Sequence, residues 1–297
     1  MKKIIAMLLV LVMLLALSAT AMADEAPAEG EDSDSKTLSF ISAWRGIKAA
    51  GLNGAFYKIG DLEMDVWLPD VLTAQTDKPD DAYFLYADST GNATIKAHIV
   101  DLDGAKTLEE VEKNVVDSGC QSDGIYWING FDALVFENKS NDSINAVILI
   151  TDEDAGVEFV FSGVSNQDMY SLSSLVLATI QHHTLDIEDV ALMMDADQQN
   201  VWGPNHHVFY GKIQDSDKSG ITVNMWDEGI DAESIKSVNN WDALRQDKID
   251  LYKLYSNVLE NFHMDDDIVL TMHFCDAKEE TSFLTIEDGE ITYDVFA

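Results

Sequence analysis

Residues 82–100 read AYFLYADSTGNATIKAHIV. Two runs rich in β-branched and aromatic residues flank a turn of small polar residues at 89–92, a pattern typical of a β-hairpin. Along the second run apolar and polar side chains alternate: Ile95, Lys96, Ala97, His98 and Ile99. This period of two predicts one buried face, with Ile95, Ala97 and Ile99, and one solvated face. The hairpin therefore predicts an antiparallel sheet with a hydrophobic core on one side.

Further elements surround this hairpin in the chain. Thr107 followed by Glu110 forms a capping box and predicts a helix that ends near Gly119. A half-buried strand is expected at 62–68, where alternation stops at Pro69. The other predicted elements are strands at 133–137, 146–150 and 157–161 and an amphipathic helix at 169–180. Residues 38–183 are thus expected to form an α+β domain.

Part of this block, roughly residues 55–183, resembles the Mog1/PsbP family. The resemblance lies in the strand that runs into Leu68 and Pro69, the helix at 107–117, and the segment from Asn129 to Ala133 that leads into a strand. It implies an antiparallel sheet flanked by helices. Members of that family are mostly binding or assembly proteins without a shared catalytic constellation, so the resemblance implies binding and supplies no active-site residues.

A second, smaller α+β domain is predicted for residues 205–297. A hairpin is expected at 208–213 and 221–226, a short helix at 231–238, and a long helix at 241–262. Strands at 268–274, 282–287 and 290–296 would form a meander, with a type I′ turn at Asp288 and Gly289. The expected inner face of the long helix is Trp241, Leu244, Leu251, Tyr255, Val258 and Phe262. This pattern predicts one long helix packed on a curled sheet, joined to the first domain by a linker at 184–204.

The first residues carry an export signal. Lys2 and Lys3 precede an apolar run at 4–17 and a small-residue site that ends at Ala23, which predicts a secretory signal peptide at 1–23. Residues 24–37 are acidic and lack apolar periodicity, so an acidic linker is expected there. The first cysteine is Cys120, so no lipid-anchoring cysteine is available near the cleavage site. We expect a secreted protein without stable membrane insertion after signal cleavage.

The composition indicates a folded but very acidic chain. The 297 residues include 54 Asp and Glu against 18 Lys and Arg, for a formal charge of −36, yet 46% of the residues are hydrophobic. That hydrophobic share supports a packed core and excludes a disordered acidic tail. An acidic surface repels phosphate groups, which argues against nucleic acid and anionic lipid as partners. Basic proteins, surface polymers, neutral ligands and cations remain as candidate partners.

The two cysteines, Cys120 and Cys275, are too few for a disulfide scaffold or a four-cysteine zinc site. One bridge between them and two separate reduced thiols are both compatible with the sequence.

Candidate metal ligands are present but poorly spaced. The pairs His182–His183 and His206–His207 flank the predicted linker, and Asp186, Asp195 or Asp197 could add a carboxylate ligand. Neighbouring residues point in different directions, so each pair can comfortably supply one ligand. Exposed polar residues at element ends are the favoured interpretation.

Two acidic turns suggest weak calcium binding at most. Asp215, Asp217, Ser219 and Gly220 match the first half of a calcium loop, but Trp226 stands where the loop needs glutamate. Residues 265–267 are three aspartates between a helix and a strand. Loosely bound divalent cations are expected, and no dedicated cage is predicted.

The sequence contains no phosphate-binding glycine motif, nucleophile elbow or metalloprotease helix. Tyr126 and Trp127 suggest either an aromatic binding platform or a packed sheet edge. We assign no catalytic, cofactor-binding or metal residue and no cofactor. The expected function is non-catalytic binding of a protein or surface polymer. The alternatives are a secreted hydrolase with a carboxylate and histidine site at the domain junction, and a structural cell-surface module.

Overall fold

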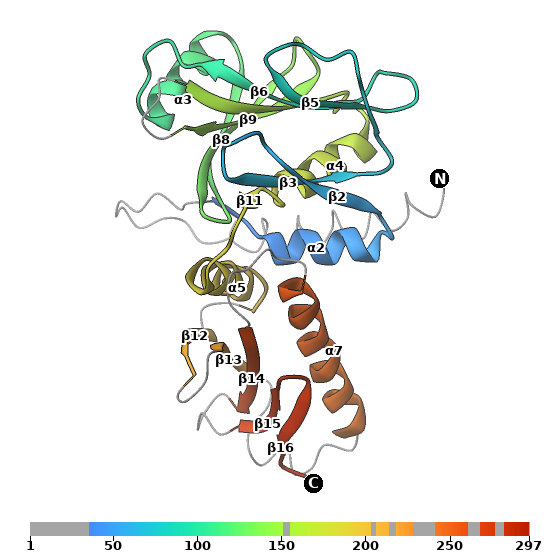
Figure 1. Ribbon diagram of the computed structural model, residues 1–297, viewed down its shortest axis with the longest axis vertical. Coiled ribbons are helices and arrows are strands. Elements are labelled where there is room, and N and C mark those ends of the chain that lie inside the picture. The colour runs from blue at the N-terminus through green and yellow to red at the C-terminus, as the bar shows by residue number, and fades with distance from the viewer. Residues whose placement is uncertain are drawn as a thin grey trace, which may run out of the picture. The chain divides into compact units, whose positions relative to one another are not determined.

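The computed structural model describes residues 36–150, 155–202, 206–213, 218–227, 241–260, 268–276 and 282–296. The chain divides into two compact units between His183 and Thr184 (Figure 1). Each unit combines helices with mainly antiparallel sheets, so the predicted α+β class is confirmed. The predicted signal peptide lies outside the described residues.

The first unit contains an eight-stranded sheet in the order β1-β7-β8-β9-β10-β6-β5-β4. The predicted hairpin and the three predicted strands that follow it are present as β5, β6, β8, β9 and β10. One detail differs, because Ile99 on β6 is 45% exposed instead of buried. The strands are β1 (Lys36–Leu38), β4 (Thr73–Ala74), β5 (Ala82–Ala87), β6 (Thr94–Asp101), β7 (Gln121–Ile128), β8 (Phe131–Asn138), β9 (Ser143–Leu149) and β10 (Ala155–Ser162).

The edge strand β1 corrects the predicted linker at 24–37. Lys36 and Thr37 belong to β1, which pairs in parallel with β7. A three-residue strand is too short to show a recognisable alternation, and its partner residues lie 90 positions further along the chain. The linker prediction therefore fails at its last two residues.

Helix α3 (Leu108–Asp117) covers part of one face of this sheet. The Thr107 hydroxyl accepts a hydrogen bond from the Glu110 amide at 3.3 Å, which confirms the predicted start of the helix. The Glu110 carboxylate accepts from the Lys106 amide at 2.7 Å, one residue before the donor expected of a capping box. The helix and the sheet share an apolar cluster of Leu102, Ala105, Leu108, Val111, Leu134, Phe136 and Val147.

The other face of the sheet adjoins a second layer (Figure 1). This layer is a three-stranded sheet in the order β11-β3-β2, with helix α2 on its far side and helix α4 against β3. Tyr57 of the small sheet packs edge-on against Phe84 of the large sheet, with 5.2 Å between the ring centres. Trp44 of α2 packs edge-on against Trp67, with 6.4 Å between the ring centres. The elements are α2 (Phe40–Ala49), β2 (Gly54–Lys58), β3 (Met64–Pro69), α4 (Gln167–Leu177) and β11 (Gln181–His182).

Strand β3 was predicted to be half-buried, and this prediction is wrong. All six of its residues are buried, including Asp65 and Trp67. Apolar and polar residues do alternate along β3, but the strand is covered on both faces. Asp65 therefore needs a hydrogen-bond partner inside the protein.

The second unit contains a five-stranded sheet in the order β12-β13-β14-β15-β16. All five predicted strands of this unit are present, and Asp288 and Gly289 have φ of 49° and 83°, as a type I′ turn requires. Strands β13 and β14 are parallel, so the sheet is mixed. The strands are β12 (His206–Lys212), β13 (Ser219–Asp227), β14 (Ile268–Asp276), β15 (Ser282–Glu287) and β16 (Glu290–Asp294).

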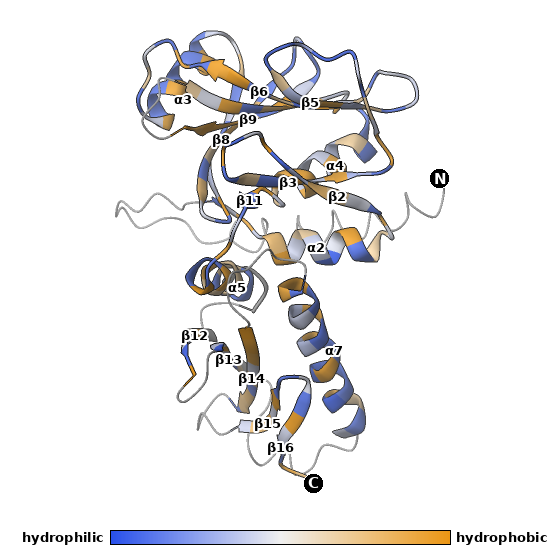
Figure 2. Cartoon of the chain, in the orientation of Figure 1, coloured by the Kyte–Doolittle hydropathy of each residue, from blue (hydrophilic) through white to orange (hydrophobic). Residues whose placement is uncertain are grey.

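Helix α5 (Ile187–Trp202) replaces the linker predicted at 184–204. Its buried positions include Val190, Met193 and Met194, and then Asp197 and Gln198, which are both fully buried. Two polar residues thus occupy core-facing positions and interrupt the apolar period that would have revealed the helix. Figure 2 shows both hydrophilic and hydrophobic residues on this helix.

Helix α7 (Trp241–Leu259) is the predicted long helix. Its fully packed side is Tyr252, Tyr255, Val258 and Leu259, whereas Leu244 and Leu251 of the predicted inner face are partly exposed. The ammonium of Lys248 lies 5.6 Å from the centre of the Phe274 ring. Phe262 and the predicted helix at 231–238 lie outside the described residues.

Candidate functional site

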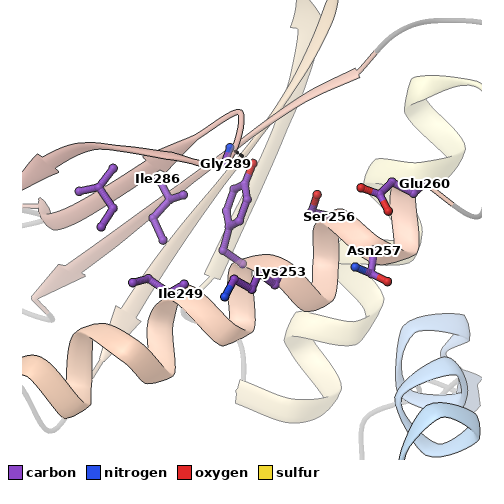
Figure 3. Close-up of a pocket in the computed structure, with 9 residues that line it drawn as sticks. Ile249, Lys253, Ser256, Asn257, Glu260, Ile286 and Gly289 are labelled. Carbon is purple, nitrogen blue, oxygen red and sulfur yellow. Dashed lines mark hydrogen bonds between the residues drawn. The ribbon is translucent and has the colours of Figure 1, made fainter.

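A groove runs between α7 and the β15–β16 hairpin of the second unit. It has a volume of about 310 Å³, at the lower end of the range for small-molecule sites. Figure 3 shows its side chains. Ile286 lies near the β15–β16 turn, while Ser256, Asn257 and Glu260 continue along α7. The lining residues are Ile249, Tyr252, Lys253, Ser256, Asn257, Glu260, Ile286, Gly289 and Ile291. This groove, which we call the α7 groove, therefore has an apolar end and a polar end.

Tyr252 forms the centre of the α7 groove. Its hydroxyl accepts a hydrogen bond from the Gly289 amide at 2.7 Å, marked by the dashed line in Figure 3. The same hydroxyl donates to the Leu270 carbonyl at 3.3 Å. Both bonds hold the ring as a rigid wall of the groove and occupy the phenol. Burial and the nearby carboxylates of Asp288 and Glu287 raise the pKa of Tyr252, so the phenol stays protonated.

The charges around the α7 groove are mainly negative. Lys253 is the cation among the lining residues, and its ammonium lies 3.8 Å from the carboxylate of Asp250. Glu260 lines the groove, and Asp288 precedes Gly289 in the hairpin turn. Three carboxylates against one ammonium favour a ligand with positive charge.

The described lining of the α7 groove contains no serine–histidine or cysteine–histidine pair. Its nine lining residues include neither histidine nor cysteine, so Ser256 has no histidine base among them. The lining fits binding by apolar contact and charge.

The histidines singled out in the sequence have other contacts. His182 packs its ring 4.2 Å from the Phe131 ring. The Nδ1 atom of His183 lies 2.9 and 3.0 Å from the two carboxylate oxygens of Asp65, which is 1% exposed. This pair gives the buried carboxylate of β3 its partner and fixes the end of the first unit. His206 and His207 begin β12, and their side chains are outside the described part of the chain.

The aspartates considered as metal ligands also have separate roles. The carboxylates of Asp186 and Asp189 each accept a hydrogen bond from the amide of the other, at 2.9 and 3.1 Å, where α5 begins. Asp197 accepts a 2.6 Å hydrogen bond from the Tyr255 hydroxyl inside the second unit. Within the described ranges, no three His, Cys, Asp or Glu residues are grouped closely enough to hold a metal ion. Asp215, Asp217 and residues 265–267 fall outside those ranges, whereas Ser219 and Gly220 belong to β13.

Tyr126 and Trp127 lie on β7, which has neighbours on both sides. The Tyr126 hydroxyl donates to Asp123 at 2.6 Å, and the Lys36 ammonium sits 5.2 Å from the ring centre. Burial and the hydrogen bond to Asp123 raise the pKa of Tyr126. The ring is held by its neighbours, which favours the packed interpretation over a free platform.

Cys120 and Cys275 do not form a disulfide with each other. Cys120 is partly exposed and Cys275 is buried, so the two-thiol alternative describes this structure.

The α7 groove was missed in the sequence. Its polar residues Ser256, Asn257 and Glu260 are indistinguishable from the solvated side of an amphipathic helix. The sequence feature that could have pointed to the groove is the Asp288–Gly289 turn, because this turn joins β15 and β16, which lie beside that helix.

Comparison with known proteins gives one structural likeness to report. The solution structure of cyanobacterial PsbP (CyanoP) from Synechocystis sp. PCC 6803 matches with a TM-score of 0.31 and 11% sequence identity. The match covers 52% of this chain and 98% of that chain. No protein-family model and no curated protein matches the sequence. The α+β class therefore rests on the helices and strands themselves.

No helix within the described residues is both long enough and apolar enough to cross a membrane.

Proposed function

We propose that this chain is an exported, non-catalytic binding protein. In this proposal the α7 groove receives an apolar group that carries a positive charge, such as a lysine or arginine side chain of a partner protein. The first unit serves as a scaffold of the Mog1/PsbP type, supported by the strand ending at Pro69, helix α3 and the Asn129–Ala133 segment. Export is supported by the signal-like sequence at 1–23.

The observation that carries the proposal is the combination of an apolar wall with an acidic rim. Ile249, Ile286 and the Tyr252 ring can remove an aliphatic stem from water. The carboxylates of Glu260 and Asp288 can then attract the charged end of that stem while it stays hydrated. The formal charge of −36 adds a long-range attraction for basic partners.

The experiment compares three capped amino acids of similar size on the mature chain, 24–297. The probes are the acetyl-amide forms of lysine, norleucine and glutamate, and the reporter is the NMR signal of the Gly289 amide, which bonds to Tyr252. We expect the lysine probe to shift this signal most, the norleucine probe less, and the glutamate probe least. Equal shifts for all three, or the strongest shift with glutamate, would refute the proposed ligand chemistry.

A pair of matched variants tests the acidic rim. Glu260→Gln removes a carboxylate of the groove. We expect this variant to weaken binding of the lysine probe severalfold and to leave binding of the norleucine probe unchanged. Asp247→Asn removes one charge from an exposed position of the same helix outside the groove lining, and should leave both probes unchanged. An equal effect of the two variants would indicate general charge instead of a site.

Export is tested separately by N-terminal sequencing of protein recovered from culture supernatant. The expected first residue is Asp24. Recovery of the chain only from the cell pellet would contradict this part of the proposal. The hydrolase at the domain junction and the structural cell-surface module stay predictions of the sequence.

A further inference from the structure

Strand β16 forms one edge of the sheet in the second unit. It pairs with β15, and no other described strand lies on its opposite side. Glu290, Thr292 and Tyr293 are exposed, and Ile291 is partly buried. An edge strand presents backbone N–H and C=O groups with which a further strand can pair. The β16 edge is therefore a place where an extended chain can be added to the sheet.

Ile291 belongs both to this edge and to the α7 groove. Glu287 and Glu290 lie opposite each other on the two sides of the Asp288–Gly289 turn, where a two-residue hairpin has a hydrogen-bonded pair. The next pair, Ile286 and Ile291, is then of the non-hydrogen-bonded kind. The N–H and C=O groups of Ile291 therefore point away from β15, while its side chain lines the groove.

The α7 groove is long enough for several residues of an extended chain. In Figure 3, Ile249 and Ile286 lie on one side of Gly289. Ser256 and Glu260 lie on the other side. From Ile249 to Glu260 the helix rises about 16 Å, which is the length of about five residues of a strand. A single lysine or arginine side chain would occupy only part of this length.

The charges along the groove and the edge favour a basic segment. Carboxylates lie near the turn and at the far end of the groove, on Glu287, Asp288, Glu290 and Glu260. Lys253 is the cation among the lining residues. These carboxylates attract a basic chain and repel an acidic one. They also repel the same edge of a second copy of this protein, which disfavours a dimer through β16.

We propose that the β16 edge binds an extended basic segment of a partner protein as an added strand, with one lysine or arginine side chain of the segment in the α7 groove. This inference rests on the proposed function, because the side chain in the groove is the positively charged ligand proposed above. Backbone pairing with Ile291 adds affinity, and the groove selects the side chain. Neighbouring side chains of the added strand point to the opposite face, on which Glu287 and Glu290 lie.

Capped peptides test the added strand on residues 24–297. The probe is acetyl-KVKVK-amide, in which all lysines share one face of a strand, and its acidic counterpart is acetyl-EVEVE-amide. NMR titration follows the amides of Gly289 and Ile291. We expect the basic peptide to bind at least about tenfold more tightly than capped lysine, since it adds backbone pairing. The acidic peptide should shift neither signal.

Two N-methylated isomers of the basic peptide separate backbone pairing from side-chain capture. One isomer carries methyl groups on both valine nitrogens, and the other carries them on the nitrogens of the last two lysines. Alternate N–H groups of a strand point to opposite sides, so one isomer blocks the side that meets β16 and the other leaves it free. We expect one isomer to lose about tenfold in affinity and the other to bind like the parent.

The results distinguish failure of the added strand from failure of the proposed function. If capped lysine shifts the Gly289 amide but both isomers bind like the parent peptide, the groove captures a side chain and the added strand is refuted. If neither capped lysine nor the basic peptide shifts this amide, the proposed function and this inference are both wrong.

A matched pair of variants locates the pairing edge. Ile291→Pro removes an N–H that points away from β15, so proline is tolerated there as at other edge positions. Ile291→Val keeps the N–H and has a side chain of similar size. We expect the proline variant to bind the basic peptide about tenfold more weakly than the valine variant, with an equal response to capped lysine. Circular dichroism and the Tm verify that both variants are folded.

Equal peptide binding by the two folded variants would overturn the assignment to the β16 edge. Light scattering identifies the competing occupant. If the wild type is a dimer that Ile291→Pro converts into a monomer, the edge joins two copies of the chain and the proposal is wrong.

Discussion

Asn129 joins three parts of the first unit through one side chain. Its Oδ1 atom accepts a hydrogen bond from the Phe40 amide at 3.1 Å, and its Nδ2 atom donates to the carbonyls of Ala178 and Ile180 at 2.8 and 2.7 Å. The residue is 1% exposed and has φ of 47°, a conformation that asparagine tolerates better than most residues. Gly130 follows with φ of 100°, and a Cβ there would lie 3.0 Å from the His182 ring.

Asn129→Ala should destabilise the first unit strongly. It leaves three buried backbone groups without their partner and places alanine at positive φ, so we expect a loss of about 3 kcal/mol or more in the free energy of unfolding. Urea unfolding measures this loss. Asn114→Ala, at an exposed position of α3, should change the same free energy by less than about 0.5 kcal/mol. A loss as small as that of the control would contradict the role given to Asn129.

Glu158 should make the stability of the first unit depend on pH. Burial on its own raises the pKa of Glu158, but hydrogen bonds from His98 and Asn145 and the charges of His98 and Lys96 outweigh burial and lower it. The two hydrogen bonds measure 3.2 and 2.6 Å. Because the pKa in the folded protein lies below the unfolded value, ionised Glu158 stabilises the fold above its ordinary pKa of 4.5. That contribution is lost as the pH falls through the pKa of the folded state.

Glu158→Gln should therefore lower the Tm at pH 7, and the difference from the wild type should shrink as the pH falls below 4.5. Thermal unfolding between pH 7 and pH 3 measures both curves. Asp132→Asn changes an exposed carboxylate of β8 and is expected to follow the wild type closely. A difference that stays constant over the whole pH range would show that ionisation of Glu158 is not responsible.

At the scale of elements, α5 and α7 are joined by buried polar groups. The Tyr255 hydroxyl donates to Asp197 and accepts from the Nε2 atom of Gln198, and all three residues are fully buried. Removing one partner of a buried hydrogen bond lowers the stability of the protein more than removing one partner of a surface hydrogen bond.

Tyr255→Phe removes only the hydroxyl that joins the two helices. We expect a loss of about 1–3 kcal/mol in the stability of the second unit and faster amide hydrogen exchange in α5. Tyr170→Phe, at an exposed tyrosine, is the matched control and should have little effect. Unchanged hydrogen exchange in α5 would argue that apolar packing alone holds this helix.

For the whole molecule, the division after His183 predicts two cooperative transitions. Differential scanning calorimetry of residues 24–297 should resolve them. Asn129→Ala should lower one midpoint and Tyr255→Phe the other. A single transition that both variants shift equally would show that the two units unfold together.

Local patterns in the sequence determined many of the elements. The β5–β6 hairpin, the start of α3 at Thr107 and the Asp288–Gly289 turn depend on side-chain alternation, one capping hydroxyl and positive φ, which involve neighbouring residues only. These features identified the α+β class and most strands without knowledge of distant partners.

Tertiary structure decided what depends on contacts between distant segments. The pairing of β1 with β7, the burial of both faces of β3 and the parallel pairing of β13 with β14 bring together segments that share no local pattern. The same reason explains α5, whose Asp197 is polar in sequence but buried beside Tyr255 in space. The α7 groove likewise exists only where the β15–β16 hairpin meets α7, because a local pattern defines a face and only packing defines what lies against it.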